Sequence, residues 1–227
     1  MSKLGSGRVF LSSLFLAVPL FGAPCTLGTL DDYIGLGSGG CSIGSYTLAD
    51  FTAIPPLLVG STEIDPTAVS ITPIPLSAPF IGLQVDTDVS ADVGDFFATF
   101  FRFRIDGTLF GADLSLTPGR VAGDGLILGI VDLCADGTFD PTGPTGCTGT
   151  PESLIVGEIP DFLFSPDFDN IPASFFDVFV ELSVDGGVSG SAASGSLSLR
   201  FDTGIPEPSS LLLMAAGLMS IAFFRRR

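Results

Sequence analysis

The sequence predicts an all-β protein, an antiparallel β-sandwich or jelly-roll-like domain of roughly 8 to 11 strands. Three observations lead to this fold class. Several segments alternate apolar and polar residues with a period of two, and turn signals containing Gly or Pro separate them. In addition, no segment before residue 209 carries the apolar stripe of an amphipathic helix.

The strand pattern is clearest in five segments. The four that alternate with period two are residues 97–105, 110–116, 176–184 and 197–201. In the first, the odd-numbered residues from Phe97 to Ile105 share one apolar face, whereas Arg102 and Arg104 lie on the other. Phe110 begins the apolar face of the second segment. Residues 126–131 are continuously apolar, which favours a strand covered on both faces.

Turn residues predict where strands end. Asp106-Gly107 and Asp185-Gly186-Gly187 are typical of tight turns between strands. Ile54-Pro55-Pro56 and the pair Pro73 and Pro75 indicate loops or sheet edges, because Pro has no backbone N–H to donate to a neighbouring strand.

The 21 Phe residues should lie mostly in the core. Phe96, Phe100 and Phe179 fall on the opposite faces of their strands, and two interpretations stand for them. They stack on sugar rings, or they pack beneath the second sheet or a loop. Packing is the favoured interpretation.

The N-terminus has the pattern of a secretory signal peptide. Lys3 and Arg8 form a basic region, residues 9–21 are apolar, and the small residues Gly22 and Ala23 follow. We therefore assign residues 1–23 to a signal peptide and expect the following chain to be exported.

The C-terminus has a different pattern. Pro206-Glu207-Pro208 precedes the uncharged residues 209–224, and the chain ends in Arg225-Arg226-Arg227. As a helix, residues 209–224 would span roughly 24 Å, somewhat short of a hydrocarbon core of about 30 Å. The Arg cluster should hold its end in the cytoplasm and stop translocation. The alternative, a buried core helix, fits poorly with a terminal Arg cluster.

Together these features resemble the PEP-CTERM sorting proteins, which are bacterial exported proteins. The likeness at the tail rests on residues 205–227, and a further one begins at Cys25 and runs through Cys41 to Phe51. Residues from Gly123-Asp124-Gly125 through Cys134 and Cys147 fit the same pattern more loosely. The resemblance implies that an exosortase-type membrane protease recognises Pro206-Glu207-Pro208 after transient membrane insertion. It also implies a cell-surface or matrix protein, often associated with exopolysaccharide, in a Gram-negative-type bacterium. It implies no catalytic residues.

Residues 24–204 would then form one exported β-sandwich domain, followed by the sorting tail, residues 205–227. With 24 acidic residues against Arg102, Arg104, Arg120 and Arg200, this exported part has a net charge of about −20. Such a charge disfavours nucleic acid as a partner. The chain has no His, and the exported part has no Lys, which excludes Ser-His-Asp triads, Cys-His nucleophiles and Schiff-base lysines there.

All four cysteines lie in the exported part, as expected of an oxidising compartment. Four cysteines allow three pairings. The pairing local in sequence, Cys25–Cys41 with Cys134–Cys147, is favoured, and each bond would constrain the unfolded chain by about 3 kcal/mol.

Catalytic and metal candidates are few. Asp86, Asp88, Asp92 and Asp95 place four carboxylates within ten residues, and carboxylate oxygens suit calcium. The spacing is not that of an EF-hand, and a solvated strand face explains the same residues, so no cofactor is assigned and calcium is the one weak candidate. A carboxylate pair for glycoside hydrolysis could arise by chance among so many acids.

The sequence thus favours a non-catalytic exported protein of the cell surface or extracellular matrix. The alternative is a calcium-assisted carbohydrate-binding module. A hydrolase is a third class, and it would require one particular Asp or Glu for activity.

Overall fold

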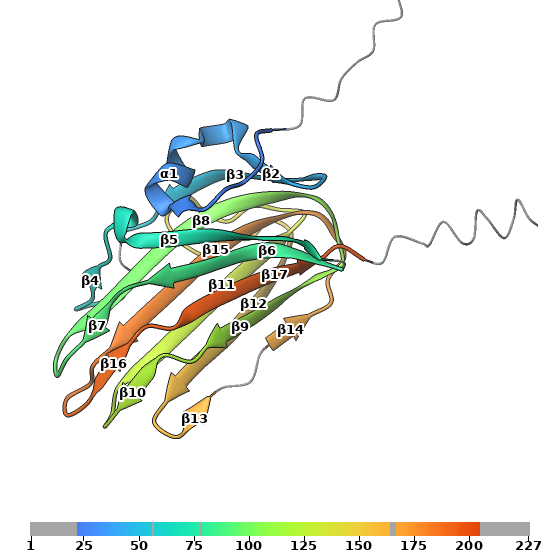
Figure 1. Cartoon of the computed structure of the whole chain (residues 1–227). Helices are drawn as coiled ribbons and strands as arrows, with labels where there is room; N and C mark the ends of the chain where they lie inside the picture. Colours follow the sequence, from blue (N-terminus) through green and yellow to red (C-terminus); the bar gives the residue numbers. More distant parts are fainter. Residues whose placement is uncertain (1–21, 56, 78, 164–166, 205–227) are drawn as a thin grey trace, which may run out of the picture.

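In the computed structural model, the described residues are 22–55, 57–77, 79–163 and 167–204. They form a predominantly β structure in which two large sheets face each other (Figure 1). Nearly all of the expected signal peptide and the whole expected membrane helix, residues 209–224, lie outside the described residues. Within the described part, no helix has the length and apolar character needed to cross a membrane.

The larger sheet has the strand order β13-β12-β11-β15-β8-β3-β2, with the short β4 paired to β8. Its neighbouring strands are antiparallel except for the β4–β8 pair. Its strands are β2 (Cys41–Ile43), β3 (Tyr46–Ala53), β4 (Thr62–Glu63), β8 (Phe96–Leu109), β11 (Leu126–Ala135), β12 (Thr150–Ile159), β13 (Phe162–Leu163) and β15 (Ala173–Asp185).

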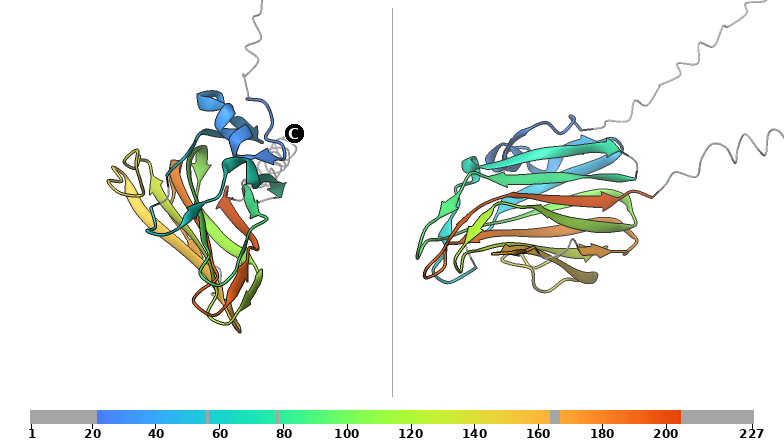
Figure 2. Two further views of the ribbon diagram at one scale, coloured as in Figure 1. Left: turned by 90° about the vertical axis from the view of Figure 1, so that its left-hand side faces the viewer. Right: turned by 60° about the horizontal axis from the view of Figure 1, so that its bottom comes forward.

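The second sheet has the order β1-β5-β6-β17-β9-β14 and packs face to face with the first (Figure 2). Its strands are β1 (Gly28–Thr29), β5 (Val69–Ser77), β6 (Phe80–Thr87), β9 (Gly111–Thr117), β14 (Asp167–Asp169) and β17 (Ser196–Asp202). A third, small sheet joins β10 (Arg120–Ala122), β16 (Ser191–Ala193) and β7 (Ser90–Ala91) at one end of the sandwich.

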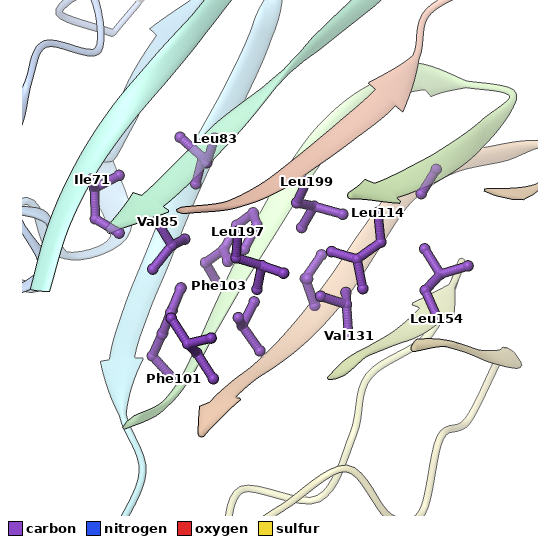
Figure 3. Close-up of a cluster of buried hydrophobic side chains, with 14 of the residues drawn as sticks. Ile71, Leu83, Val85, Phe101, Phe103, Leu114, Val131, Leu154, Leu197 and Leu199 are labelled. Atoms are coloured by element: carbon purple, nitrogen blue, oxygen red, sulfur yellow. The ribbon is translucent and has the colours of Figure 1, made fainter. Parts of the chain in front are cut away.

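The main core lies between the two large sheets. Figure 3 shows Phe101, Phe103 and Val131 of the larger sheet meeting Leu197 and Leu199 of β17. All five side chains are buried. The inward faces are those that the period-two pattern predicts, and the all-β sandwich expected from the sequence is confirmed.

The described residues form 17 strands, more than the 8 to 11 expected, because eight short strands of two or three residues accompany the nine that have seven or more. The turn after Asp185 is confirmed, because β15 ends at that residue. Pro73 and Pro75 lie in β5 beyond the two residues that pair with β1, so both occupy a sheet edge, as predicted. Ile54 and Pro55 follow the end of β3 in a loop.

Two predictions at the end of β8 are wrong. Asp106-Gly107 is not a turn, because β8 continues through it to Leu109 with a shift in its register against β15. Gly107 has φ +143°, and a Cβ there would lie 2.3 Å from the Tyr46 ring, so close packing requires this glycine. Phe110 does not join the core face. It is 40% exposed and lies where the chain crosses from one sheet to the other.

The sequence pattern also missed a helix, α1 (Leu30–Gly35), and two single-turn 3₁₀ helices, η1 (Gly37–Gly39) and η2 (Pro66–Ala68). Thr29 and Asp32 form a reciprocal capping box at the start of α1. Leu30 and Tyr33 are buried in the main core, next to β3 and β5 at the edge where the sheets meet (Figures 1 and 2). Six residues are too few to show a helical stripe, which is why the periodicity gave no signal.

Both favoured disulfides are present. Cys25 is bonded to Cys41 and Cys134 to Cys147, and no described cysteine is free. The first bond closes the segment that carries α1, and the second closes a loop between β11 and β12.

Candidate functional site

The outer face of the larger sheet, turned away from the main core, carries a second hydrophobic cluster. Phe100 and Phe179 project outward from β8 and β15 and are covered by Phe139, which comes from the loop closed by Cys134–Cys147. All three rings are at least 94% buried. The packing interpretation is therefore correct for Phe100 and Phe179, and neither can stack on a sugar. Phe96 is half-buried.

Beside this cluster lies a cleft of about 320 Å³. Its walls come from the end of β3, the middle of β8, one residue of β15 and the disulfide-closed loop. The lining residues are Asp50, Thr52, Ile54, Arg102, Phe103, Arg104, Thr138, Pro141 and Asp177. Its volume lies within the range of about 300–1,000 Å³ that is usual for small-molecule sites.

Asp50 owes its position in the cleft to an irregular backbone. The pairing of β3 with β8 shifts register between Ala49 and Thr52, which forms a bulge. Asp50 lies in this bulge with φ +58°, a left-handed conformation that side chains other than Gly adopt at some cost. Its side chain is exposed at the cleft.

Arg102 is held by a nearly buried carboxylate. Its Nε donates to Asp177 Oδ1 at 2.6 Å and its Nη2 to Asp177 Oδ2, a bidentate pair. Asp177 also accepts the Phe139 backbone N–H at 2.7 Å, which ties the disulfide-closed loop to the sheet. Arg102 Nη1 donates to the Asp140 carbonyl at 3.4 Å. The guanidinium is thus fixed on two sides, and its side chain remains 21% exposed.

Arg104 is fixed in a different way. Its Nε and Nη2 donate to Asp106 Oδ1 at 2.8 and 2.6 Å, and its guanidinium carbon lies 4.0 Å from the Phe175 ring centroid. The hydrogen bond to Asp106, with smaller contributions from the Asp106, Asp50 and Asp177 charges, raises the pKa of Arg104. It remains a cation at any physiological pH.

The cleft therefore combines fixed donors with an exposed acceptor. Two guanidinium groups donate, the Asp50 carboxylate accepts, and Thr52 and Thr138 add hydroxyl groups. Each Arg is already paired with a carboxylate, Arg102 with Asp177 and Arg104 with Asp106. With Asp50 added, the site carries no net positive charge. Such a site suits a polar, uncharged ligand with several hydroxyl groups better than an anion.

A pair of acids lies on the other side of the Phe139 cluster. Asp132 of β11 is opposite Phe179, and Glu181 of β15 is opposite Ile130, so the two acids are diagonal neighbours on the outer face. Burial raises the pKa of Glu181, and the Asp132 charge adds to this rise. Burial also raises the pKa of Asp132, against a hydrogen bond from Ser153 that lowers it. Neither acid lines the cleft.

Of the four calcium candidates, Asp86 lies in β6, Asp88 lies between β6 and β7, and Asp92 and Asp95 lie between β7 and β8. Asp86 accepts hydrogen bonds from Gln84 and Ser196, and Asp92 and Asp95 bond to each other within one turn. Asp88 is exposed. Among the described residues, no three Asp, Glu or Cys side chains come together as a possible metal site.

The residues predicted for sorting, Pro206-Glu207-Pro208 and Arg225-Arg226-Arg227, lie outside the described residues. The domain that precedes them is ordered up to its last described residues. The Thr203 backbone N–H donates to the Pro79 carbonyl at 2.7 Å, and the Gly204 N–H donates to Asp202 Oδ1 at 2.8 Å.

The comparison with protein-family models identifies this tail. Residues 204–227 match the PEP-CTERM protein-sorting motif, so the chain carries that motif. The match spans the tail alone and therefore leaves the β-sandwich unassigned. A search of curated proteins finds no relative of the chain.

Three solved structures show distant likeness. The enzymatically active domain of bacteriophage CBA120 tailspike protein 4 is 16% identical, with TM-score 0.25 over 74% of this chain, and the match spans only 20% of that domain. TmCBM61 in complex with β-1,4-galactotriose is 10% identical, with TM-score 0.26 over 71% of this chain and 87% of the other. The C-terminal family 22 carbohydrate binding module of Clostridium thermocellum Xyn10B is 11% identical, with TM-score 0.23 over 81% and 98%. At such scores the fold assignment rests on the strands and sheets themselves.

Proposed function

We propose that the protein is a non-catalytic, exported component of the bacterial cell surface or extracellular matrix, sorted by an exosortase-type membrane protease through residues 205–227. The observation that carries the proposal is the sorting motif at residues 204–227. Two disulfides in the domain support export, because such bonds persist mainly in oxidising compartments.

In this proposal the two ends of the chain act in sequence. Residues 1–23 direct the domain across the inner membrane, and Arg225-Arg226-Arg227 then stop translocation with residues 209–224 in the membrane. The protease recognises Pro206-Glu207-Pro208 on the outer side and releases the domain. Pro206 follows Gly204, the last described residue, by two positions in the sequence. The proposed recognition motif is therefore adjacent in sequence to the β-sandwich.

The sorting step is tested by replacing Glu207 in the full chain, in a bacterium that has an exosortase. We expect Glu207→Ala to accumulate in the membrane fraction at the unprocessed mass, whereas wild type reaches the surface or medium in a shortened form. Glu63→Ala, which removes an exposed acid within the domain, is the matched control and should behave as wild type. An unchanged mature mass and location of Glu207→Ala would contradict the proposal.

A second candidate function is carbohydrate binding, and the observation that favours it is the polar cleft beside the Phe139 cluster. An exopolysaccharide would be the natural partner of an exported matrix protein. The calcium-assisted form of this function, through Asp86, Asp88, Asp92 and Asp95, has less support, because these carboxylates do not come together as a metal site among the described residues. A chelator tests it directly: calcium-assisted binding of the purified protein to the polysaccharide of its own bacterium would weaken, whereas unchanged binding would exclude a role for calcium.

A further inference from the structure

We propose that the cleft formed by the β3 bulge, Arg102, Arg104 and the disulfide-closed loop is a binding site for a neutral saccharide, and that binding there needs no calcium. The proposal rests on the second candidate function and adds the location of the site and the class of its ligand. It is independent of sorting through the tail.

Preorganisation of the donors is the first argument. Arg102 is held by the nearly buried Asp177 in a bidentate pair, and Arg104 is held by Asp106 and the Phe175 ring. Neither guanidinium has to be ordered when a ligand arrives, so little conformational entropy is lost on binding. Arg102 and Arg104 are two of the four cationic side chains in the whole exported part. Both lie two residues apart on the outward face of β8, so strand alternation places them at the same cleft.

The second argument is the strained backbone at Asp50. Asp tolerates the left-handed region better than most residues, but φ +58° in a strand bulge is still less favourable for Asp than for Gly. Among the described residues no group donates a hydrogen bond to the Asp50 carboxylate, and its interaction with the domain is an electrostatic attraction to Arg104. A carboxylate exposed at the same cleft as two guanidinium groups can accept a hydrogen bond from a ligand hydroxyl.

Charge decides the class of ligand. Asp106 and Asp177 already neutralise the two Arg side chains, and Asp50 leaves a net negative charge around the cleft. A phosphate or a uronic acid would meet this charge and the field of a domain with a net charge of about −20. The hydroxyl groups of a neutral sugar can accept from Arg and donate to Asp at the same time. The ligating groups are side chains of this cleft, and none belongs to the acidic stretch from Asp86 to Asp95.

The test uses the full chain purified in a mild detergent, titrated with neutral gluco-, manno- and galacto-oligosaccharides and with oligogalacturonate, each with and without EDTA. Calorimetry gives the Kd. We expect at least one neutral oligosaccharide to bind, with the same Kd in EDTA, and to bind at least tenfold more weakly to Arg104→Ala. Arg120→Ala is the matched control, because it removes an exposed Arg far from the cleft, and it should bind within twofold of wild type.

Asp50→Gly separates binding from folding. Because Gly tolerates φ +58°, this variant should have an unchanged or higher Tm, by about 2–3 °C at most, while losing at least tenfold in affinity. It therefore keeps the proposal falsifiable if Arg104→Ala fails to fold.

Each outcome has a separate meaning. If no saccharide binds, the carbohydrate-binding function itself fails. If a saccharide binds equally well to wild type, Arg104→Ala and Asp50→Gly, binding occurs elsewhere and the cleft assignment is wrong. Preference for oligogalacturonate would overturn the neutral class, and loss of binding in EDTA would overturn calcium independence.

Discussion

The two disulfide-closed segments resemble each other in size but differ in what they contribute. Cys25–Cys41 and Cys134–Cys147 span sequence separations of 16 and 13 residues. The first segment contributes Leu30 and Tyr33 to the main core between the sheets. The second contributes Phe139 to a separate cluster on the outer face.

The difference shows that two disulfides closing loops of similar length can support different parts of the structure. Loop-closure entropy predicts about 3 kcal/mol for either bond, so any larger difference in their effects must come from the residues that each segment packs. The N-terminal segment completes the core at the edge where the sheets meet. The second segment also builds a wall of the cleft, through Thr138 and Pro141.

The largest expected effect follows from removing the first disulfide. Cys25→Ser combined with Cys41→Ser should lower the free energy of unfolding by about 3–5 kcal/mol, because loss of the restraint is joined by looser packing of Leu30 and Tyr33. Thermal unfolding followed by circular dichroism should show a Tm about 10 °C lower. A Tm within a degree of wild type would show that this segment does not support the core.

Removing the second disulfide should lower the free energy of unfolding less than removing the first, but it should lower saccharide affinity more. Cys134→Ser with Cys147→Ser should lower the free energy of unfolding by about 2–3 kcal/mol, because a small peripheral cluster is loosened. The same variant should lose saccharide affinity, whereas the first disulfide variant, measured well below its Tm, should keep it. If the two variants lose stability and affinity in the same proportion, the proposed difference between the two segments is wrong.

Phe139→Ala tests the second cluster without changing a covalent bond. The ring covers Phe100 and Phe179 and is 6% exposed, so its loss should cost about 2 kcal/mol, below the usual range for a core Phe because the loop can relax. Urea unfolding measures the change. Val188→Ala, which truncates a side chain that is 85% exposed, is the control and should have no measurable effect.

The smallest expected effect concerns pH. Burial raises the folded-state pKa of Glu181 above its unfolded value of about 4.3, with Asp132 adding to the rise. The folded state therefore favours the neutral, protonated form of Glu181. The stability that this form contributes is complete below the unfolded pKa and is lost as pH rises through the folded pKa. Glu181→Gln should therefore raise the Tm at pH 7. The gain should be only about 1–2 °C, because the Glu181 side chain is only partly buried and solvent screens the effect. At pH 4 the gain should shrink, and an equal gain at both pH values would contradict this cause.

The sequence was sufficient for the parts of the fold that depend on local periodicity. The inward faces of β8, β15 and β17 follow from alternation, and the disulfide pairing follows from nearness in sequence. Asp106-Gly107 was misjudged because a glycine required by contact with Tyr46 has the same sequence signature as a turn. For α1, the signal was the capping box at Thr29 and Asp32, and no periodicity accompanied it.

The cleft could not be predicted from the sequence. Its residues come from β3, β8, β15 and a loop, and they meet only through sheet pairing and the Phe139 cluster. The pattern did place Arg102 and Arg104 on the outward face of one strand. Nothing in the local sequence indicated that Asp177 would hold Arg102, or that a bulge would bring Asp50 beside them.

The central claim, export followed by sorting through the tail, is tested most directly by intact-mass spectrometry of the protein recovered from the surface or medium of a bacterium with an exosortase. We predict a mass that lacks residues from both ends of the chain, with an increase of two hydrogens for each disulfide on reduction. Recovery of the protein only at the mass of the full chain, or a mass unchanged by reduction, would contradict the account.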